Sequence, residues 1–215
     1  MKPYLALLLP AALLSGCATL SESECRTANW RDLGRADGQH GYEATRLGEH
    51  QDACGKYGIA PDAAAYQAGR DEGLRLYCTP QVALGEGRAG NEYHAVCPGD
   101  ANLMFVRYYQ RGSVQHQLDA EAGEIQQELD AQNQAKDATG DLGLYKMLEQ
   151  NGRYLERTLH RVQGLQQRAQ FDIDADRDPQ VYASGRWRSD LPYPDARAQA
   201  DKWRQQHQHD HDKDH

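Results

Sequence analysis

Apolar side chains recur every three or four residues along the stretch that follows Gly99-Asp100, in a background rich in Gln and acidic residues. This spacing predicts a long helix over residues 101–136, with the stripe Leu103, Val106, Tyr109, Val114, Leu118, Ile125 and Leu129. After a turn at Thr139-Gly140-Asp141, a second stripe alternates steps of three and four like a heptad seam: Tyr145, Leu148, Gly152, Leu155, Leu159, Val162, Gln166 and Ala169. Residues 99–170 are therefore expected to form an antiparallel helical hairpin. Its stripes are expected to bury against each other, and the open alternative is an arm that docks a partner or oligomerises.

Residues 25–98 carry a different helical pattern, in which an aromatic residue precedes G-x-x-x-G. Trp30 comes before Gly34 and Gly38, and Tyr66 comes before Gly69 and Gly73. A looser echo follows over residues 84–93. Glycine in a helix costs about 1 kcal/mol relative to Ala, so two on one face indicate close approach to another backbone or a helix break. A phosphate-binding glycine loop would need a preceding strand and a Lys-Ser/Thr or acidic signature, and the sequence has neither.

The amino terminus reads as a leader. Met1-Lys2 is basic, Tyr4–Leu14 is apolar except for Pro10, and eleven residues are too few to span a bilayer. Leu14-Ser15-Gly16-Cys17 follows and resembles the lipobox of bacterial lipoproteins. That resemblance implies cleavage of residues 1–16 and acylation of Cys17. Residue 18 is Ala rather than Asp, which in such lipoproteins favours the periplasmic face of the outer membrane, the inner membrane being the alternative.

Four further cysteines remain: Cys25, Cys54, Cys78 and Cys97. An even number in an oxidising compartment predicts two disulfides. The sequence has no C-x-x-C, as close-paired zinc sites and redox motifs require. Of the three connectivities, Cys25–Cys54 with Cys78–Cys97 is favoured because each pair brackets one local unit, and the crossed pairing Cys25–Cys78 with Cys54–Cys97 stays open.

Composition limits the classes of function. The net charge is −8, which argues against nucleic acid or an anionic lipid surface as an electrostatic partner. Leu, Ile, Val and Phe make up roughly 14% of the chain after the leader, below the ~20% at which a charged chain begins to struggle to bury a core. No G-x-S-x-G and no H-E-x-x-H occurs. We therefore expect neither an enzyme nor a bound cofactor.

Residues 171–215 are predicted to be an extended or disordered tail. Its end is rich in His and Asp, and His207, His209, His211 and His215 suit weak binding of Zn, Cu or Ni. A solubilising tail is the simpler interpretation. A periplasmic metal-buffering protein is the alternative function that this tail supports.

The cysteine-rich half also resembles a known family. Its pattern is Cys25…Trp30-x3-Gly34-x2-Asp37-Gly38…Cys54…Tyr66-x2-Gly69-x3-Gly73-Leu74-x2-Tyr77-Cys78-Thr79-Pro80…Gly87-x2-Gly90-x2-Tyr93-x3-Cys97-Pro98. This is similar to a family of uncharacterised Gram-negative lipoproteins, known only as a domain of unknown function. The family usually has a Gly soon after the Thr-Pro pair, where this chain has Gln81-Val82-Ala83. The resemblance implies no activity.

The sequence thus predicts an all-α protein in five parts. A signal peptide (1–16) and a lipidated tether (17–24) precede a small disulfide-stapled helical domain (25–98), a long coiled-coil-like hairpin (99–170) and the tail (171–215). We expect a lipoprotein held in the bilayer through acylated Cys17, serving as a structural or interaction module for an unidentified envelope protein. An enzyme with an unrecognised site is the third hypothesis.

Overall fold

The computed structural model describes residues 19–179 and 186–211, and their side chains as far as Gln206. This part of the chain is helical and has no strand, which confirms the all-α class. It divides into two compact units. Unit 1 extends to Cys78 and takes in His94–Cys97, and unit 2 consists of Thr79–Tyr93 and the chain from Pro98 onward.

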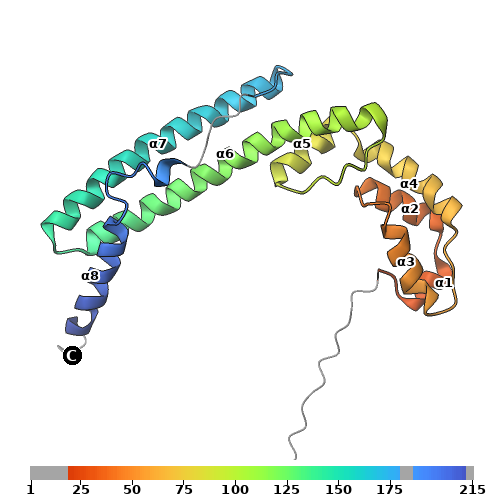
Figure 1. Cartoon of the computed structure of the whole chain (residues 1–215), viewed down its shortest axis with the longest axis horizontal. Coiled ribbons are helices and arrows are strands. Elements are labelled where there is room, and N and C mark those ends of the chain that lie inside the picture. The colour runs from red at the N-terminus through yellow and green to blue at the C-terminus, as the bar shows by residue number, and fades with distance from the viewer. Residues whose placement is uncertain (1–18, 180–185, 212–215) are drawn as a thin grey trace, which may run out of the picture. The chain divides into compact units, whose positions relative to one another are not determined.

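Unit 1 contains four helices: α1 (Glu22–Thr27), α2 (Trp30–Gln39), α3 (Arg46–Gly55) and α4 (Ala63–Tyr77) (Figure 1). Three of their first turns are capped by side chains, which satisfy backbone N–H groups that a helix leaves unpaired. Ser21 and Glu24 form a capping box on α1, Asn29 accepts from the amides of Arg31 and Asp32, and Asp62 accepts from Ala65. The local sequence therefore determines where these helices begin.

Helices α2 and α4 cross at their glycines. A Cβ added to Gly34 or Gly38 would overlap the carbonyl oxygen of Tyr66 or Arg70 on α4. A Cβ on Gly69 or Gly73 would overlap the carbonyl oxygen of Arg31 or Arg35 on α2. The close-approach interpretation of the two G-x-x-x-G segments is confirmed, because neither backbone leaves room for a side chain.

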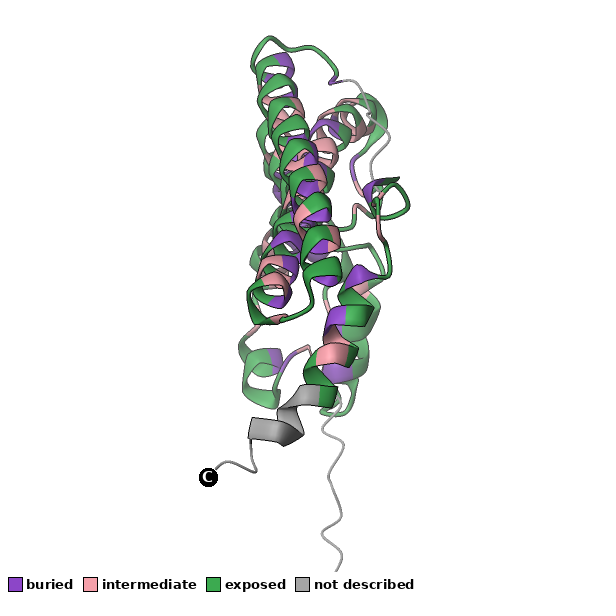
Figure 2. Cartoon of the chain, turned by 90° about the vertical axis from the view of Figure 1, so that its left-hand side faces the viewer, coloured by how far each residue is buried: buried purple, intermediate pink, exposed green. Residues whose placement is uncertain are grey.

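Unit 2 contains α5 (Pro80–Ala89), α6 (Gly99–Ala138), α7 (Leu142–Asp174), the short 3₁₀ helix η1 (Arg186–Arg188) and α8 (Ala196–His211). Helices α6 and α7 run side by side in opposite directions, joined by the expected turn at residues 139–141 (Figure 1). Buried positions recur along the sides that these helices turn toward each other (Figure 2). The hairpin agrees with the sequence, and both helices extend a few residues beyond the predicted ends.

Most of the predicted seam is buried. Leu148, Gly152, Leu155, Val162 and Ala169 of α7 are buried, and on α6 so are Leu118, Ile125 and Leu129. The other predicted members are less covered: the side chain of Leu103 is 70% exposed and that of Tyr145 is 40% exposed, and the half-buried ones are Val106, Tyr109, Val114, Leu159 and Gln166. At Tyr145 the neighbouring Leu144 is the buried residue instead, so the heptad spacing does not identify every position that faces the core.

Helix α5 packs on α6 and not within unit 1, although the sequence pattern predicts residues 79–93 to be part of the cysteine-rich domain. The physical reason is a second glycine crossing. A Cβ on Gly87 would overlap the carbonyl oxygen of Tyr109, and one on Gly112 would overlap that of Leu84. The third glycine segment, over residues 84–93, therefore packs backbone against backbone as the first two do. Its partner is α6 of unit 2, not a helix of unit 1.

Part of the region expected to be an extended tail is packed against the hairpin. Trp187 is 2% exposed and belongs to the same apolar cluster as Leu155. Ala196 and Ala200 of α8 are fully buried against Leu144 and Leu148. The side chain of Asn151 binds the backbone of Tyr193 twice, at 2.8 Å to its carbonyl and 3.0 Å from its amide. Small and aromatic side chains of this region pack on the hairpin here, which corrects the expectation of disorder over the described residues.

The two disulfides join Cys25 to Cys54 and Cys78 to Cys97, the pairing that the sequence analysis favours. Their Cα–Cα distances are 5.5 and 5.7 Å, within the usual range. The first bond ties α1 to α3. The second closes around α5, which belongs to the other unit.

Candidate functional site

Four polar side chains from three helices and the start of the described chain meet inside unit 1. Asp37 of α2 accepts a hydrogen bond of 2.7 Å from the hydroxyl of Tyr66 on α4. The Nε2 atom of His50 on α3 lies 2.8 Å from the same carboxylate oxygen. On its other side, Nδ1 of His50 lies 2.9 Å from Oγ1 of Thr19. The three helix residues are each at most 6% exposed, so these contacts replace water.

The chemistry of the groups assigns the direction of these hydrogen bonds. A carboxylate oxygen only accepts, so Tyr66 O–H and His50 Nε2–H both donate to Asp37. The Nδ1 atom of His50 accepts from the hydroxyl of Thr19 when the imidazole is neutral and donates to it when the ring is protonated. Burial raises the pKa of Tyr66 above its ordinary value, and its hydrogen bond to Asp37 raises it further. Tyr66 is therefore held as a donor.

The order hydroxyl, imidazole, carboxylate is also that of a nucleophilic triad. A nucleophile needs a cleft in which a substrate can meet both the hydroxyl and oxyanion donors. Neither of the two depressions described below is lined by Thr19. What the contacts do accomplish is to bind residue 19 to α2, α3 and α4, and we refer to Thr19, Asp37, His50 and Tyr66 as the latch.

An apolar cluster lies next to the latch, around the first disulfide. Leu20, Ala53 and the cystine Cys25–Cys54 are buried, and Trp30, Leu33 and Ile59 pack against them while remaining partly exposed. An open depression of about 360 Å³ runs beside Leu20 between α1 and α2. Its apolar lining is Leu20, Ala28, Leu33 and Ala36, and Glu24 and Asp32 contribute carboxylates. Leu20 therefore packs in the cluster around the first disulfide and also borders the open depression.

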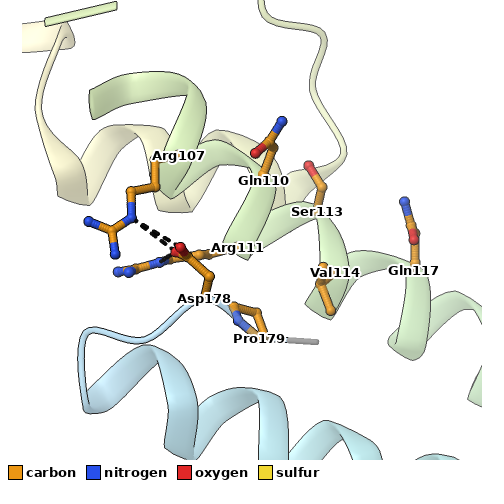
Figure 3. A pocket seen from close by; sticks show the side chains of 8 residues that line it. All are labelled: Arg107, Gln110, Arg111, Ser113, Val114, Gln117, Asp178 and Pro179. Carbon is orange, nitrogen blue, oxygen red and sulfur yellow. Dashed lines mark hydrogen bonds and ion pairs between the residues drawn. The ribbon is translucent and has the colours of Figure 1, made fainter. Parts of the chain in front are cut away.

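Unit 2 has a polar groove on α6, with a volume of about 470 Å³ (Figure 3). Arg111 has a side chain that is 1% exposed and donates from Nε to Asp178 at 2.7 Å and from Nη1 to Asp176 at 2.6 Å. Arg107 also donates to Asp178, at 3.0 Å. Arg111 stacks on the ring of Tyr108 at 4.6 Å, and the Tyr108 hydroxyl donates to Asp176.

These contacts, which we name the clasp, fasten the segment after α7 back onto α6. Hydrogen bonds from Arg111 lower the pKa of Asp176 and of Asp178, so both stay acceptors. The hydrogen bond to Asp176 raises the pKa of Tyr108, so Tyr108 stays a donor. The two arginines of the groove have their charge matched by two aspartates of the same chain. The clasp therefore holds the fold of unit 2 together, and its arginines are already engaged.

The structure describes only some of the site residues that the sequence predicts. Cys17 and His215 lie outside the described residues. His207, His209 and His211 belong to α8, but their side chains lie outside the described part. In the side chains that are described, no group of three or more His, Cys, Asp or Glu is arranged to hold a metal ion. Among the described helices, none is long and apolar enough to cross a membrane.

The sequence alone predicts neither the latch nor the clasp. His50 and Asp37 are 13 residues apart on different helices, with no motif linking them. The clasp joins Arg107 and Arg111 to aspartates that lie 65 to 71 residues further along the chain, and no motif links them. A stripe of Ala196, Ala200 and Trp203 at steps of four and three could have revealed α8.

Residues 29–114 match a family model described as a protein of unknown function (DUF2799). No curated protein and no solved structure matches the chain. The matched segment begins at Asn29, the cap of α2, and ends at Val114, just after the glycine of α6 that contacts α5. It contains both glycine crossings and three latch residues. Thr19, α7 and α8 lie outside it, so this chain is similar to an uncharacterised family over the crossings and the start of α6.

Proposed function

We propose that this chain is a lipid-anchored envelope protein. Acylated Cys17 holds unit 1 at the periplasmic face of the outer membrane, and the hairpin of unit 2 is an arm for binding another envelope protein. One observation carries the proposal. The fold incorporates the chain from Thr19 onward, two residues after the lipobox cysteine, and binds it through the latch and through buried Leu20.

The start of the fold supports cleavage and acylation at Cys17. Only Ala18 separates Cys17 from Thr19, where the described fold begins. Acylation of Cys17 would therefore hold unit 1 at the bilayer without a long linker. Each buried methylene of an acyl chain contributes about 0.8 kcal/mol, so several chains on one cysteine give lasting attachment. Ala18, rather than Asp, favours the outer membrane under the sorting rule for such lipoproteins.

The dimensions of the hairpin support its role as an arm. Helix α6 has 40 residues, which corresponds to about 60 Å at 1.5 Å per residue. Its surface is rich in Gln and acidic residues, and the chain's net charge of −8 disfavours nucleic acid. A long polar surface of this kind suits a protein partner that is recognised by hydrogen bonds and shape.

The test is the chemical state of Cys17 in the mature protein. Mass analysis is expected to find a chain that begins at an acylated Cys17, and Cys17→Ser is expected to abolish both the modification and membrane attachment. Ser15→Ala is the matched control, since it keeps a small residue in the lipobox and should leave processing unchanged. An unmodified Cys17 in the native protein, or a membrane-bound Cys17→Ser variant, would overturn the proposal.

A further inference from the structure

The distance between the anchor and the fold is very short. Thr19, the first described residue, is two residues from Cys17, and two residues span at most about 7 Å when fully extended. If Cys17 lies at the bilayer surface, as the proposed function requires, the part of unit 1 around Leu20 lies there too. An α-helix with its side chains is about 10 Å across, so even one helix of another protein could not fit between.

The surface around Leu20 is apolar and aromatic. Trp30, Leu33 and Ile59 pack on the buried cluster of Leu20 and are themselves only partly covered. Tyr57 follows α3 and lies two residues before Ile59; its side chain is 39% exposed, and its amide donates to the carbonyl of Cys54 at 2.9 Å. We refer to five residues together as the collar: Leu20, Trp30, Leu33, Tyr57 and Ile59.

We propose that the collar is a membrane-docking surface, occupied by the interfacial layer of the bilayer into which Cys17 is anchored. This inference rests on the proposed function. Trp and Tyr suit that layer because a large apolar ring carries one polar group. The depression beside Leu20 adds apolar lining from Ala28, Leu33 and Ala36 that lipid can cover.

The attraction is apolar rather than electrostatic. Glu24 and Asp32 line the same depression, and the whole chain carries a net charge of −8. Basic surfaces bind anionic headgroups, and this surface has the opposite charge. Docking is therefore expected on vesicles of phosphatidylcholine alone, with no loss when salt is raised.

The experiment couples the mature chain to vesicles through Cys17. The other four cysteines form disulfides, so the thiol of Cys17 reacts selectively with a maleimide lipid in phosphatidylcholine vesicles. The chain has three tryptophans, and Trp187→Phe with Trp203→Phe leaves Trp30 as the only reporter. Phosphatidylcholine brominated on its acyl chains is expected to reduce Trp30 emission at least twofold, with circular dichroism verifying that the helices persist.

A matched pair of charge substitutions localises the contact. Tyr57→Glu places a carboxylate in the collar, and Leu76→Glu places one at a 52% exposed position of the same unit, outside the collar. Both replace exposed side chains, so neither removes a core contact. Tyr57→Glu is expected to restore most of the Trp30 emission, whereas Leu76→Glu should leave the quenching intact.

The outcomes separate this inference from the proposed function. Because maleimide coupling substitutes for acylation, the vesicle measurement reports on the collar whether or not cells acylate Cys17. Unquenched Trp30 in the coupled protein, or equal quenching in the Tyr57→Glu variant and the parent, would overturn docking by the collar. Absence of acylation in cells would overturn the proposed function through the mass analysis described above.

Discussion

Asp37 is a carboxylate in the interior of unit 1, and both of its donors come from other helices. Removing one donor leaves the buried carboxylate with fewer hydrogen bonds and no water to replace the lost one. The resulting loss of stability is larger than the net contribution of the hydrogen bond. The sequence cannot single out Asp37. Asp32, on the same helix, is exposed, and a single sequence does not distinguish a buried acid from a solvated one.

The raised pKa of Tyr66 makes a prediction about alkaline stability. A group whose pKa is higher in the folded than in the unfolded chain stabilises the fold fully below its unfolded value, here 10.0, and progressively less as pH rises toward the folded value. We expect unit 1 to lose about 1.4 kcal/mol per pH unit above pH 10. Urea unfolding of the Trp187→Phe, Trp203→Phe variant, followed by Trp30 fluorescence, measures this slope.

Tyr66→Phe should lower stability at pH 8, because Asp37 loses a donor, and should flatten the slope above pH 10. Tyr57→Phe is the control, since Tyr57 is an exposed tyrosine of the same unit and should leave the slope as it is. An unchanged slope in Tyr66→Phe would mean that other groups set the alkaline behaviour.

At the scale of elements, the glycine crossings are the feature that the sequence predicts best. The repeated G-x-x-x-G segments pack backbone against backbone at α2 with α4, and the looser echo does so at α5 with α6. The seam of α7 is also correctly predicted over Leu148, Leu155 and Val162. Helix α3 was not anticipated, because its buried positions are His50, Ala53 and Cys54, which give no strong apolar period.

Two glycines of α5 offer an internal comparison. A Cβ on Gly87 would overlap the carbonyl oxygen of Tyr109, whereas one on Gly85 meets nothing within 4 Å. Gly87→Ala is therefore expected to destabilise unit 2 by about 1–3 kcal/mol through forced separation of the helices. Gly85→Ala is expected to stabilise it by up to about 1 kcal/mol, because Ala favours the helix.

Thermal unfolding of both variants measures the difference. The two substitutions lie two residues apart in one helix and add the same methyl group, so intrinsic helix propensity alone predicts the same sign for both. A stabilised Gly87→Ala variant would show that α5 and α6 do not approach as closely as described.

At the scale of the whole molecule, the division into two units predicts separate responses to damage. Leu155 is fully buried between α6, α7 and the segment of Trp187. Leu155→Ala typically costs 2–5 kcal/mol, a large part of the 5–15 kcal/mol that stabilises most domains. We expect hydrogen exchange to rise across unit 2, including α5, while α2 and α4 keep their protection.

Leu76→Ala, at an exposed position of unit 1, is the control and should alter neither unit. Equal acceleration of exchange in both units by Leu155→Ala would contradict the division and indicate one cooperative fold. The sequence predicts a disulfide-stapled domain and a helical hairpin, but it does not predict that α5 belongs to the unit of the hairpin. That assignment depends on Gly87 meeting Gly112 across 25 positions, and sequence spacing alone does not specify it.

The bond between Cys78 and Cys97 has a topological consequence. It encircles the segment that crosses into unit 2 and back, so a peptide bond cut anywhere from residue 79 to residue 96 leaves two fragments that are still covalently joined. Such a nicked protein migrates as one band on a non-reducing gel and as two after reduction. A protease that severs the connection between the units at this place therefore does not release the hairpin from unit 1.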